Sequence, residues 1–331
     1  MQTIVVTGGS GFIGSHLCER LLGEGNRVVN IDNFNDFYDP EIKYSNVSET
    51  KQYCIANGIP LKNYSVAKGD ICDISFLKET FTKYCPQAVV HLAAYAGVRP
   101  SILSPELYVN VNINGTTNIL QCLKEFGVKN FVFASSSSVY GNNKNVPFSE
   151  NDPVDFPISP YAATKKAGEL ICYTYHHLYN INTACLRFFT VYGPRQRPDL
   201  AIHKFTQLIM DDKAIPFYGD GTTQRDYTYI ADIIDGITKA LDWVNNDEQR
   251  YGIFNLGESR TISLKDMVRT IEKALDRKAQ FTIQPSQPGD VNRTFADISK
   301  SREILGYNPH TEFYQGIRYF VQWYKSTNNI K

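Results

Sequence analysis

Apolar residues in this chain follow two alternating patterns. Short apolar runs rich in β-branched residues occupy 3–7, 27–31, 87–94 and 129–134, and a further run ends near residue 71. Such runs predict buried parallel strands, because a strand that is covered on both faces needs no polar side. Between them, apolar residues with helical spacing predict helices at about 12–22, 44–57 and 105–126. Strands that alternate with helices predict an α/β fold with a doubly wound parallel sheet.

The pattern changes in the second half of the chain. From about residue 189 the apolar runs are shorter and less regular. Helices are predicted there at 202–210, 230–244, 264–275, 299–305 and 313–324. We therefore expect two domains. The first covers residues 1–180, with 226–250 returning to it, and the second is a smaller α/β domain at 181–331.

Three glycines stand between the first predicted strand and the helix that follows it. Gly8, Gly11 and Gly14 form the pattern G-x-x-G-x-x-G. Glycines at this place permit a tight turn and a close approach of the backbone to a pyrophosphate, whose charge is stabilised at the helix N-terminus. A tight turn without a ligand is the alternative, but the position between a strand and a helix favours a dinucleotide. We expect Gly8, Gly11, Phe12 and Ile13 to contact it.

Asp32 closes the second predicted strand. An acidic side chain there accepts hydrogen bonds from the adenosine ribose and repels a 2′-phosphate. Residues 33–35 supply no arginine to bind such a phosphate, so the sequence favours NAD over NADP. We expect His91 to pack within its strand rather than to act in catalysis. Further residues expected beside the cofactor are Asn33, Asp70, Ile71, Leu92, Ala93, Ala94 and Asn112.

Composition excludes several classes of partner. Lys and Arg together equal Asp and Glu, 34 each, so no overall field attracts nucleic acid or a membrane, and an anionic ligand must meet local basic groups. Seven scattered cysteines without a C-x-x-C pair argue against a disulfide framework or a metal site and fit a reducing compartment. Met1 leads directly into an apolar strand, and no run approaches the ~20 apolar residues of a membrane span. We expect a cytoplasmic protein without a signal peptide.

Tyr161 and Lys165 stand four residues apart, which places them on one face of a helix. A free phenol has a pKa of about 10 and is a poor base at neutral pH. A nearby ammonium favours the phenolate and lowers that pKa. Pro160 suits the start of such a helix. Taken alone the pair is a weak signal, because a surface helix can carry both residues by chance.

The ordered set of motifs is more specific than any one of them. It runs Gly8-x-x-Gly11-x-x-Gly14, Asp32, Asp70-Ile71, His91-Leu-Ala-Ala, Ser136 and Tyr161-x-x-x-Lys165. Over essentially its whole length the chain resembles the extended short-chain dehydrogenases/reductases, the NAD-dependent nucleotide-sugar epimerases and dehydratases. The resemblance implies a Rossmann-type NAD-binding domain, a domain that binds a UDP-sugar, and catalysis by Tyr161, Lys165 and Ser136. It also implies a homodimer formed through helices 104–126 and 160–178.

The residues before Val139-Tyr140-Gly141 separate the members of this group. The similar 4,6-dehydratases carry an Asp-Glu pair there, and the uronate decarboxylases carry a Glu. In this chain Ser137 and Ser138 occupy those positions, so a carboxylate for eliminating water is missing from the expected place. This difference favours 4-epimerisation, with Ser136, Ser137 and Ser138 beside the sugar.

Three further stretches, 32–43, 94–101 and 187–199, resemble the UDP-glucuronate 4-epimerases. This resemblance implies that Thr190 and Arg197 hold the sugar carboxylate, a role in which arginine can bind bidentately. It also implies that Arg225 reaches the UDP phosphates. Arg99 and Arg293 are further candidates, with a structural ion pair or a solvated side chain as the alternative.

The resemblance also implies a mechanism. Tyr161 takes the O4 proton while C4 passes a hydride to bound NAD, Ser136 binds O4, and Lys165 lowers the tyrosine pKa. The 4-keto sugar then rotates and is reduced on its other face, which interconverts UDP-glucuronate and UDP-galacturonate. The alternatives are a UDP-hexose or UDP-N-acetylhexosamine 4-epimerase, a UDP-glucuronate decarboxylase, and an NAD-sensing protein without enzymatic activity.

Overall fold

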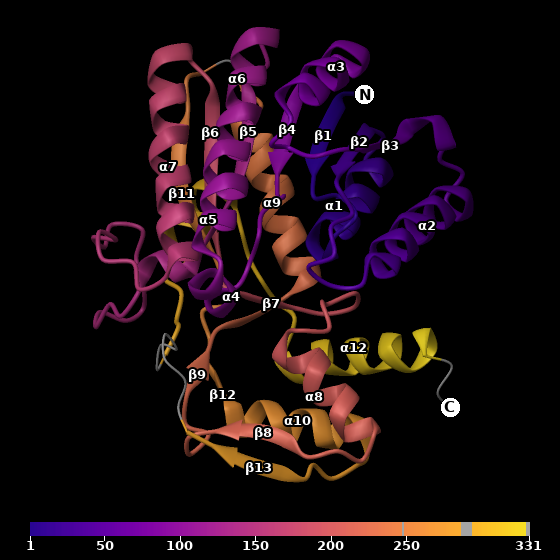
Figure 1. The fold of residues 1–331 in the computed structure, drawn as a ribbon, viewed down its shortest axis with the longest axis vertical. Coiled ribbons are helices and arrows are strands. Elements are labelled where there is room, and N and C mark those ends of the chain that lie inside the picture. Colours follow the sequence, from indigo (N-terminus) through magenta and orange to yellow (C-terminus); the bar gives the residue numbers. More distant parts are fainter. Residues whose placement is uncertain (247, 286–292, 329–331) are drawn as a thin grey trace.

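A seven-stranded parallel sheet forms the centre of the larger part of the protein (Figure 1). This computed structural model describes residues 1–246, 248–285 and 293–328. The strand order is β11-β6-β5-β4-β1-β2-β3. Strands β2 and β3 follow on one side of β1 and strands β4, β5, β6 and β11 on its other side, which confirms the predicted doubly wound sheet. The strands are β1 (Thr3–Thr7), β2 (Arg27–Asp32), β3 (Tyr64–Lys68), β4 (Ala88–His91), β5 (Asn130–Ser136), β6 (Asn182–Phe188) and β11 (Tyr251–Leu256).

Helices cover both faces of this sheet. Because successive strand residues point to opposite faces, Ile4 and Val6 of β1 pack into one core and Val5 packs into the other. The first core contains α1 (Phe12–Gly23), α2 (Pro40–Ala56) and α9 (Ile230–Val244). The second contains α3 (Ile74–Tyr84), α6 (Thr116–Phe126) and α7 (Pro160–Tyr179). Burial on both faces explains why these strands read as continuous apolar runs.

The helix predicted at 105–126 is divided in the structure. A short α-helix, α5 (Pro105–Tyr108), runs into a π-helical segment at Val109–Gly115, and α6 follows. Asn112 lies in this segment and binds the backbone of Tyr95 at both its N–H and its carbonyl (2.9 and 3.0 Å). π-helical turns are rare and occur frequently at functional sites. The spacing of apolar residues in the sequence does not predict the contact between Asn112 and Tyr95.

The sheet extends beyond the domain boundary expected at residue 180. β6 begins at Asn182 and pairs with β5 along its whole length, and β11 pairs in turn with β6. Both strands therefore belong to the sheet, although the expected boundaries at 180 and 250 leave them outside it. α9 packs against β5 and β6, as expected for a segment that returns to the first domain.

The smaller part has its own apolar core, and Figure 1 places it below the sheet. Three of the predicted helices appear here as α8 (Ala201–Met210), α10 (Leu264–Leu275) and α12 (Phe313–Thr327). Another predicted helix, α11 (Ser299–Leu305), packs instead on β11 and α9 of the larger part. Paired short strands complete it: β7 (Thr190–Tyr192) with β10 (Tyr227–Tyr229), β8 (Ile215–Tyr218) with β13 (Phe281–Gln284), and β9 (Gln224–Arg225) with β12 (Ile262–Ser263). Among the described residues, no helix has the length and apolar character needed to cross a membrane.

A buried ion pair ties α7 to the sheet. Arg187 of β6 donates from Nε and Nη2 to the two carboxylate oxygens of Glu169 (2.8 and 2.9 Å), and both side chains are 1% exposed. The Ser135 hydroxyl donates to the same carboxylate at 2.6 Å. The guanidinium also lies 4.8 Å from the centre of the Tyr140 ring. Lys166 approaches the same carboxylate at 3.7 Å. Losing Arg187 would remove the two short charged hydrogen bonds of the buried Glu169, and losing Glu169 would leave the Arg187 charge buried without its partner.

We predict that Arg187→Met lowers the free energy of unfolding by about 3–5 kcal/mol, because it removes the closest charged partner of a carboxylate that is buried inside the protein. Urea titration followed by circular dichroism measures this change. The matched control is Arg20→Met, which breaks an exposed pair with Glu24 and should change stability by less than about 1 kcal/mol. Equal losses in the two variants would contradict the importance of the buried pair.

Candidate active site

One cavity gathers the carboxyl ends of the central strands. The structure brings to it every residue that the sequence predicted beside the cofactor except Asn112. The side chains of Tyr161, Lys165 and Arg197 also line it. The predicted residues that line it are Gly8, Gly11, Phe12, Ile13, Asp32, Asn33, Asp70, Ile71, Leu92, Ala93 and Ala94. This is the edge of the sheet at which a doubly wound fold binds its ligands.

The glycine turn leads directly into the N-terminus of α1. Gly8 has φ +70°, a conformation that favours glycine, and a Cβ on Gly14 would lie 2.1 Å from the Gly8 carbonyl oxygen. Gly11 is the N-cap residue of α1 and provides no side-chain cap, so backbone N–H groups at this helix end are available to an anion. The local geometry therefore suits a pyrophosphate.

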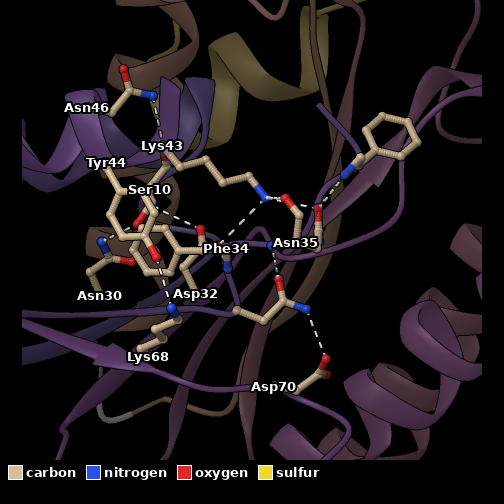
Figure 2. Close-up of polar contacts among 12 residues, drawn as sticks. Ser10, Asn30, Asp32, Phe34, Asn35, Lys43, Tyr44, Asn46, Lys68 and Asp70 are labelled. Carbon is tan, nitrogen blue, oxygen red and sulfur yellow. Dashed lines mark hydrogen bonds and ion pairs between the residues drawn. The ribbon is translucent and has the colours of Figure 1, made fainter. Parts of the chain in front are cut away.

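Asp32 lies in a polar cluster behind this turn, shown in Figure 2. Its carboxylate accepts hydrogen bonds from the backbone N–H groups of Ser10 (3.2 Å) and Phe34 (2.9 Å), while burial raises its pKa. Lys43 approaches to 4.0 Å and donates to the Asn35 carbonyl and side-chain oxygens, each at 2.9 Å. Lys43 is a lining residue that our reading of the sequence did not identify. The only available signal was its place at the end of the stretch 32–43.

Asn112 supports the cavity without lining it. The side chain is 2% exposed, and besides Tyr95 it binds the Thr164 hydroxyl at 3.1 Å. The protein already occupies this amide, and the contact between Asn112 and a cofactor stays a prediction. His91 is buried between the hydroxyls of Thr7 (2.7 Å) and Thr116 (3.0 Å), as expected for a packed strand residue.

Tyr161 lines the cavity near the end of β5, and Ser136 is the last residue of that strand. Ser159 caps α7 by accepting from the Ala162 N–H (3.2 Å), and Pro160 occupies the first helical turn as predicted. This start places Tyr161 near the end of β5, where burial raises the tyrosine pKa and an interaction with the Ser136 side chain opposes that rise. Ser136 also contacts the Ser138 hydroxyl (3.1 Å) and accepts from the Ser138 N–H. Ser137 and Ser138 belong to a 3₁₀ turn at Ser137–Tyr140, directly after the strand.

The pKa of Tyr161 depends first on burial. Burial raises it, and the opposing influences are the interaction with Ser136 and the positive charge of Arg197. Lys165 instead donates to the Ala134 carbonyl at 2.7 Å, and its own burial lowers its pKa to about 8. The ammonium is thus directed to the strand, and the effect of Lys165 on the tyrosine pKa stays a prediction.

A second cavity, lined by basic residues, lies between the two parts. Arg99, Lys204 and Arg225 line it together with Asp199 and Tyr218. The Arg99 guanidinium lies 5.3 Å from the centre of the Tyr218 ring. The structure thus brings together two of the predicted phosphate ligands, Arg99 and Arg225. A local cluster of this kind is what a protein of zero net charge needs to bind a diphosphate.

As far as the described residues show, five other predicted substrate residues are not among the residues that line either cavity: Ser136, Ser137, Ser138, Thr190 and Arg293. Arg293 is exposed, its guanidinium lies 5.0 Å from the Phe295 ring, and its backbone pairs with Gln224 beside Arg225. The residues before it, 286–292, lie outside the described part of the chain. Thr190 begins β7 and donates its N–H to the Asp226 carbonyl at 3.0 Å. Their assignment to the substrate stays a prediction.

The loop that carries Arg197 is anchored on α1 and α2, two helices that the sequence predicted. Arg195 pairs with Glu19 of α1 (2.8 Å) and with Glu49 of α2 (2.7 Å). Arg197 then reaches the first cavity, where its guanidinium lies 5.2 Å from the centre of the Phe37 ring. It also donates two hydrogen bonds to Asp199 (2.9 and 2.8 Å). Our reading of the sequence did not identify the anchoring role of Arg195 or the pairing by Asp199.

Comparison with known proteins identifies the family. Residues 5–320 match the family model described as GDP-mannose 4,6-dehydratase, so the chain belongs to this family of extended short-chain dehydrogenases/reductases. It is 42% identical over 326 residues to a UDP-glucuronate 4-epimerase of Thermodesulfobacterium geofontis, covering 98% of this chain and 97% of that protein. It is also 42% identical over 338 residues to UDP-glucuronate 4-epimerase 4 of Arabidopsis thaliana, covering 98% of this chain and 75% of that protein.

Solved structures agree with this result. A crystal structure of the Bacillus cereus UDP-glucuronic acid 4-epimerase in complex with UDP-glucuronic acid and NAD has a TM-score of 0.85 and 34% identity, covering 98% of this chain and 99% of that one. A UDP-glucose 4-epimerase of Thermotoga maritima with UDP-glucose has a TM-score of 0.87 and 28% identity, with the same coverage. The fold is thus shared by epimerases of different sugars, and the side chains of the site must distinguish among them.

Proposed function

We propose that this chain is an NAD-dependent UDP-glucuronate 4-epimerase, which interconverts UDP-glucuronate and UDP-galacturonate through a 4-keto sugar. The observation that carries this proposal is that Arg197 lines the same cavity as Tyr161 and Lys165. A guanidinium beside the base suits a sugar with a carboxylate next to the reacting carbon. Full-length similarity to UDP-glucuronate 4-epimerases supports the same substrate.

The first cavity fits NAD. The uncapped N-terminus of α1 offers N–H groups to the pyrophosphate, and Asp32 offers a buried carboxylate to the adenosine ribose. The bound cofactor supplies the chemistry of hydride acceptance and return at C4. The protein contributes the position of the sugar and the movement of the O4 proton.

Tyr161 acts as the base toward the sugar O4 hydroxyl. Ser136 interacts with it and orients the proton that passes between them. Burial raises the pKa of the phenol, so the phenolate needs nearby positive charges that stabilise it. Arg197 already contributes such a charge, and the buried Lys165 lies one helical turn away on the same cavity wall.

A uronate needs protection from decarboxylation. Oxidation at C4 makes the C6 carboxylate β to a ketone, an arrangement that readily loses CO₂. Arg197 would hold that carboxylate, with Thr190 as a second candidate, and Ser137 and Ser138 stand where decarboxylases and dehydratases carry acids. Arg99 and Arg225 would bind the diphosphate in the second cavity. Arg293, next to Gln224, is the further candidate for that group.

A cytoplasmic homodimer is part of this proposal. Leu170, Tyr173 and Leu178 of α7 are 57%, 52% and 58% exposed, which is unusual for large apolar side chains on one helix. A second copy of the same helix would cover them, as the predicted four-helix contact requires. The seven scattered cysteines of the sequence, without a C-x-x-C pair, fit a reducing compartment.

We predict that Tyr161→Phe lowers kcat by about 10²–10⁴-fold, because it removes the group that takes the O4 proton. NAD should remain bound, which absorbance of the purified protein and release of the nucleotide on denaturation measure. Tyr173→Phe removes a hydroxyl from an exposed position of the same helix and should keep normal activity. Near-normal turnover in Tyr161→Phe would rule out its role as the base.

We predict that Arg197→Ala lowers kcat/KM for UDP-glucuronate by roughly 10- to 100-fold, the effect of losing a charge-assisted hydrogen bond. UDP-glucose and UDP-N-acetylglucosamine, which lack the carboxylate, should lose far less. NMR of the sugar products measures all three reactions and separates the proposed function from the neutral-sugar epimerases.

Arg260→Ala is the control, because it removes an exposed arginine paired with Glu312 outside both cavities. Equal losses on charged and neutral sugars would remove the assignment of Arg197. Release of CO₂ with formation of a UDP-pentose by the unmodified protein would instead identify a decarboxylase.

A further inference from the structure

Asp199 occupies the carboxylate-binding edge of Arg197. Two parallel hydrogen bonds join Arg197 Nε to Oδ1 (2.9 Å) and Nη2 to Oδ2 (2.8 Å). This fork-to-fork geometry is the one in which arginine binds any carboxylate, including that of a ligand. The residue proposed to grip the uronate therefore already holds a carboxylate of the protein.

The pair also lies where the two cavities meet. Arg197 lines the cavity that contains Tyr161, whereas Asp199 lines the cavity that contains Arg99 and Arg225. A UDP-sugar with its phosphates near the arginines and its C4 near Tyr161 must pass beside this pair. Asp199 would then face the same side of the guanidinium as the incoming sugar.

The exposure of the two side chains indicates which partner can leave. The Arg197 side chain is 18% exposed and packs on the Phe37 ring, and Asp199 is 44% exposed. The loop of Arg197 is fixed by the pairs of Arg195 with Glu19 and Glu49. The carboxylate can thus turn into solvent while the guanidinium keeps its place.

We propose that Asp199 occupies the position of the substrate carboxylate on Arg197: it pairs with Arg197 until the carboxylate of a uronate displaces it. This inference rests on the proposed function and deepens it. The exchange replaces one carboxylate with another, so the guanidinium never remains half-buried without a partner. A neutral hexose offers no carboxylate for the exchange. Asp199 therefore acts as a specificity-determining residue through Arg197.

The test is Asp199→Asn, which keeps the shape of the side chain and removes its charge. Because a partly exposed ion pair is weak, loss of the competitor should lower KM for UDP-glucuronate by about two- to fivefold with kcat unchanged. Calorimetry with the NAD-loaded protein should show the same gain in affinity. UDP-glucose and UDP serve as controls. If the lost charge of Asp199 acted only on the phosphates, the affinity for all three ligands would rise equally.

The double variant Arg197→Ala, Asp199→Asn completes the test. If Asp199 acts only through Arg197, the Asp199→Asn change should give no gain for UDP-glucuronate in the Arg197→Ala background. A rise in KM for Asp199→Asn would overturn the proposal, because Asp199 would then position Arg197 rather than compete for it. An equal gain for all three ligands, or no gain at all, would also overturn it. If the unmodified protein does not epimerise UDP-glucuronate, the proposed function itself fails, which is a distinct result.

Discussion

The buried pairing of Glu169 with Arg187 is the interaction on which the geometry of the site depends. Glu169 lies on α7, one turn beyond Lys165, and Arg187 lies on β6. Ser135, the neighbour of Ser136, donates to the same carboxylate. One carboxylate thus fixes the helix that carries Tyr161, the proposed base, against the strand end that carries Ser136. Burial of two charges costs several kcal/mol, and here good hydrogen-bond geometry on both carboxylate oxygens offsets it.

A second constraint is that charge is concentrated locally in a protein whose net charge is zero. Arg197 stands beside Tyr161, whereas Arg99 and Arg225 stand in the neighbouring cavity. A ligand with a diphosphate at one end and a carboxylate at the other would complement this arrangement. Acidic side chains lie among these basic ones, because Asp199 pairs with Arg197 and Asp32 lines the same cavity as Tyr161.

Much of this organisation follows from the sequence. The bounds of β1 and of α9, α10 and α11 were predicted residue for residue, because their apolar spacing is regular. The glycine turn and Asp32 were placed correctly, since their backbone requirements are local. Other features depend on residues far apart in the chain: Asn112 on Tyr95, Lys165 on Ala134, and Arg195 on Glu49. No local pattern reports such contacts, and the raised pKa of Tyr161 arises from burial that only the folded chain creates.

The central claim is that the chain inverts C4 of a uronate by removing and returning the hydrogen of that carbon. The most direct measurement is NMR of UDP-glucuronate incubated with the purified protein in D₂O. The account predicts UDP-galacturonate that retains protium at C4, because a hydride held by the bound cofactor does not exchange with water. Deuterium at C4, or a UDP-pentose formed with release of CO₂, would contradict it.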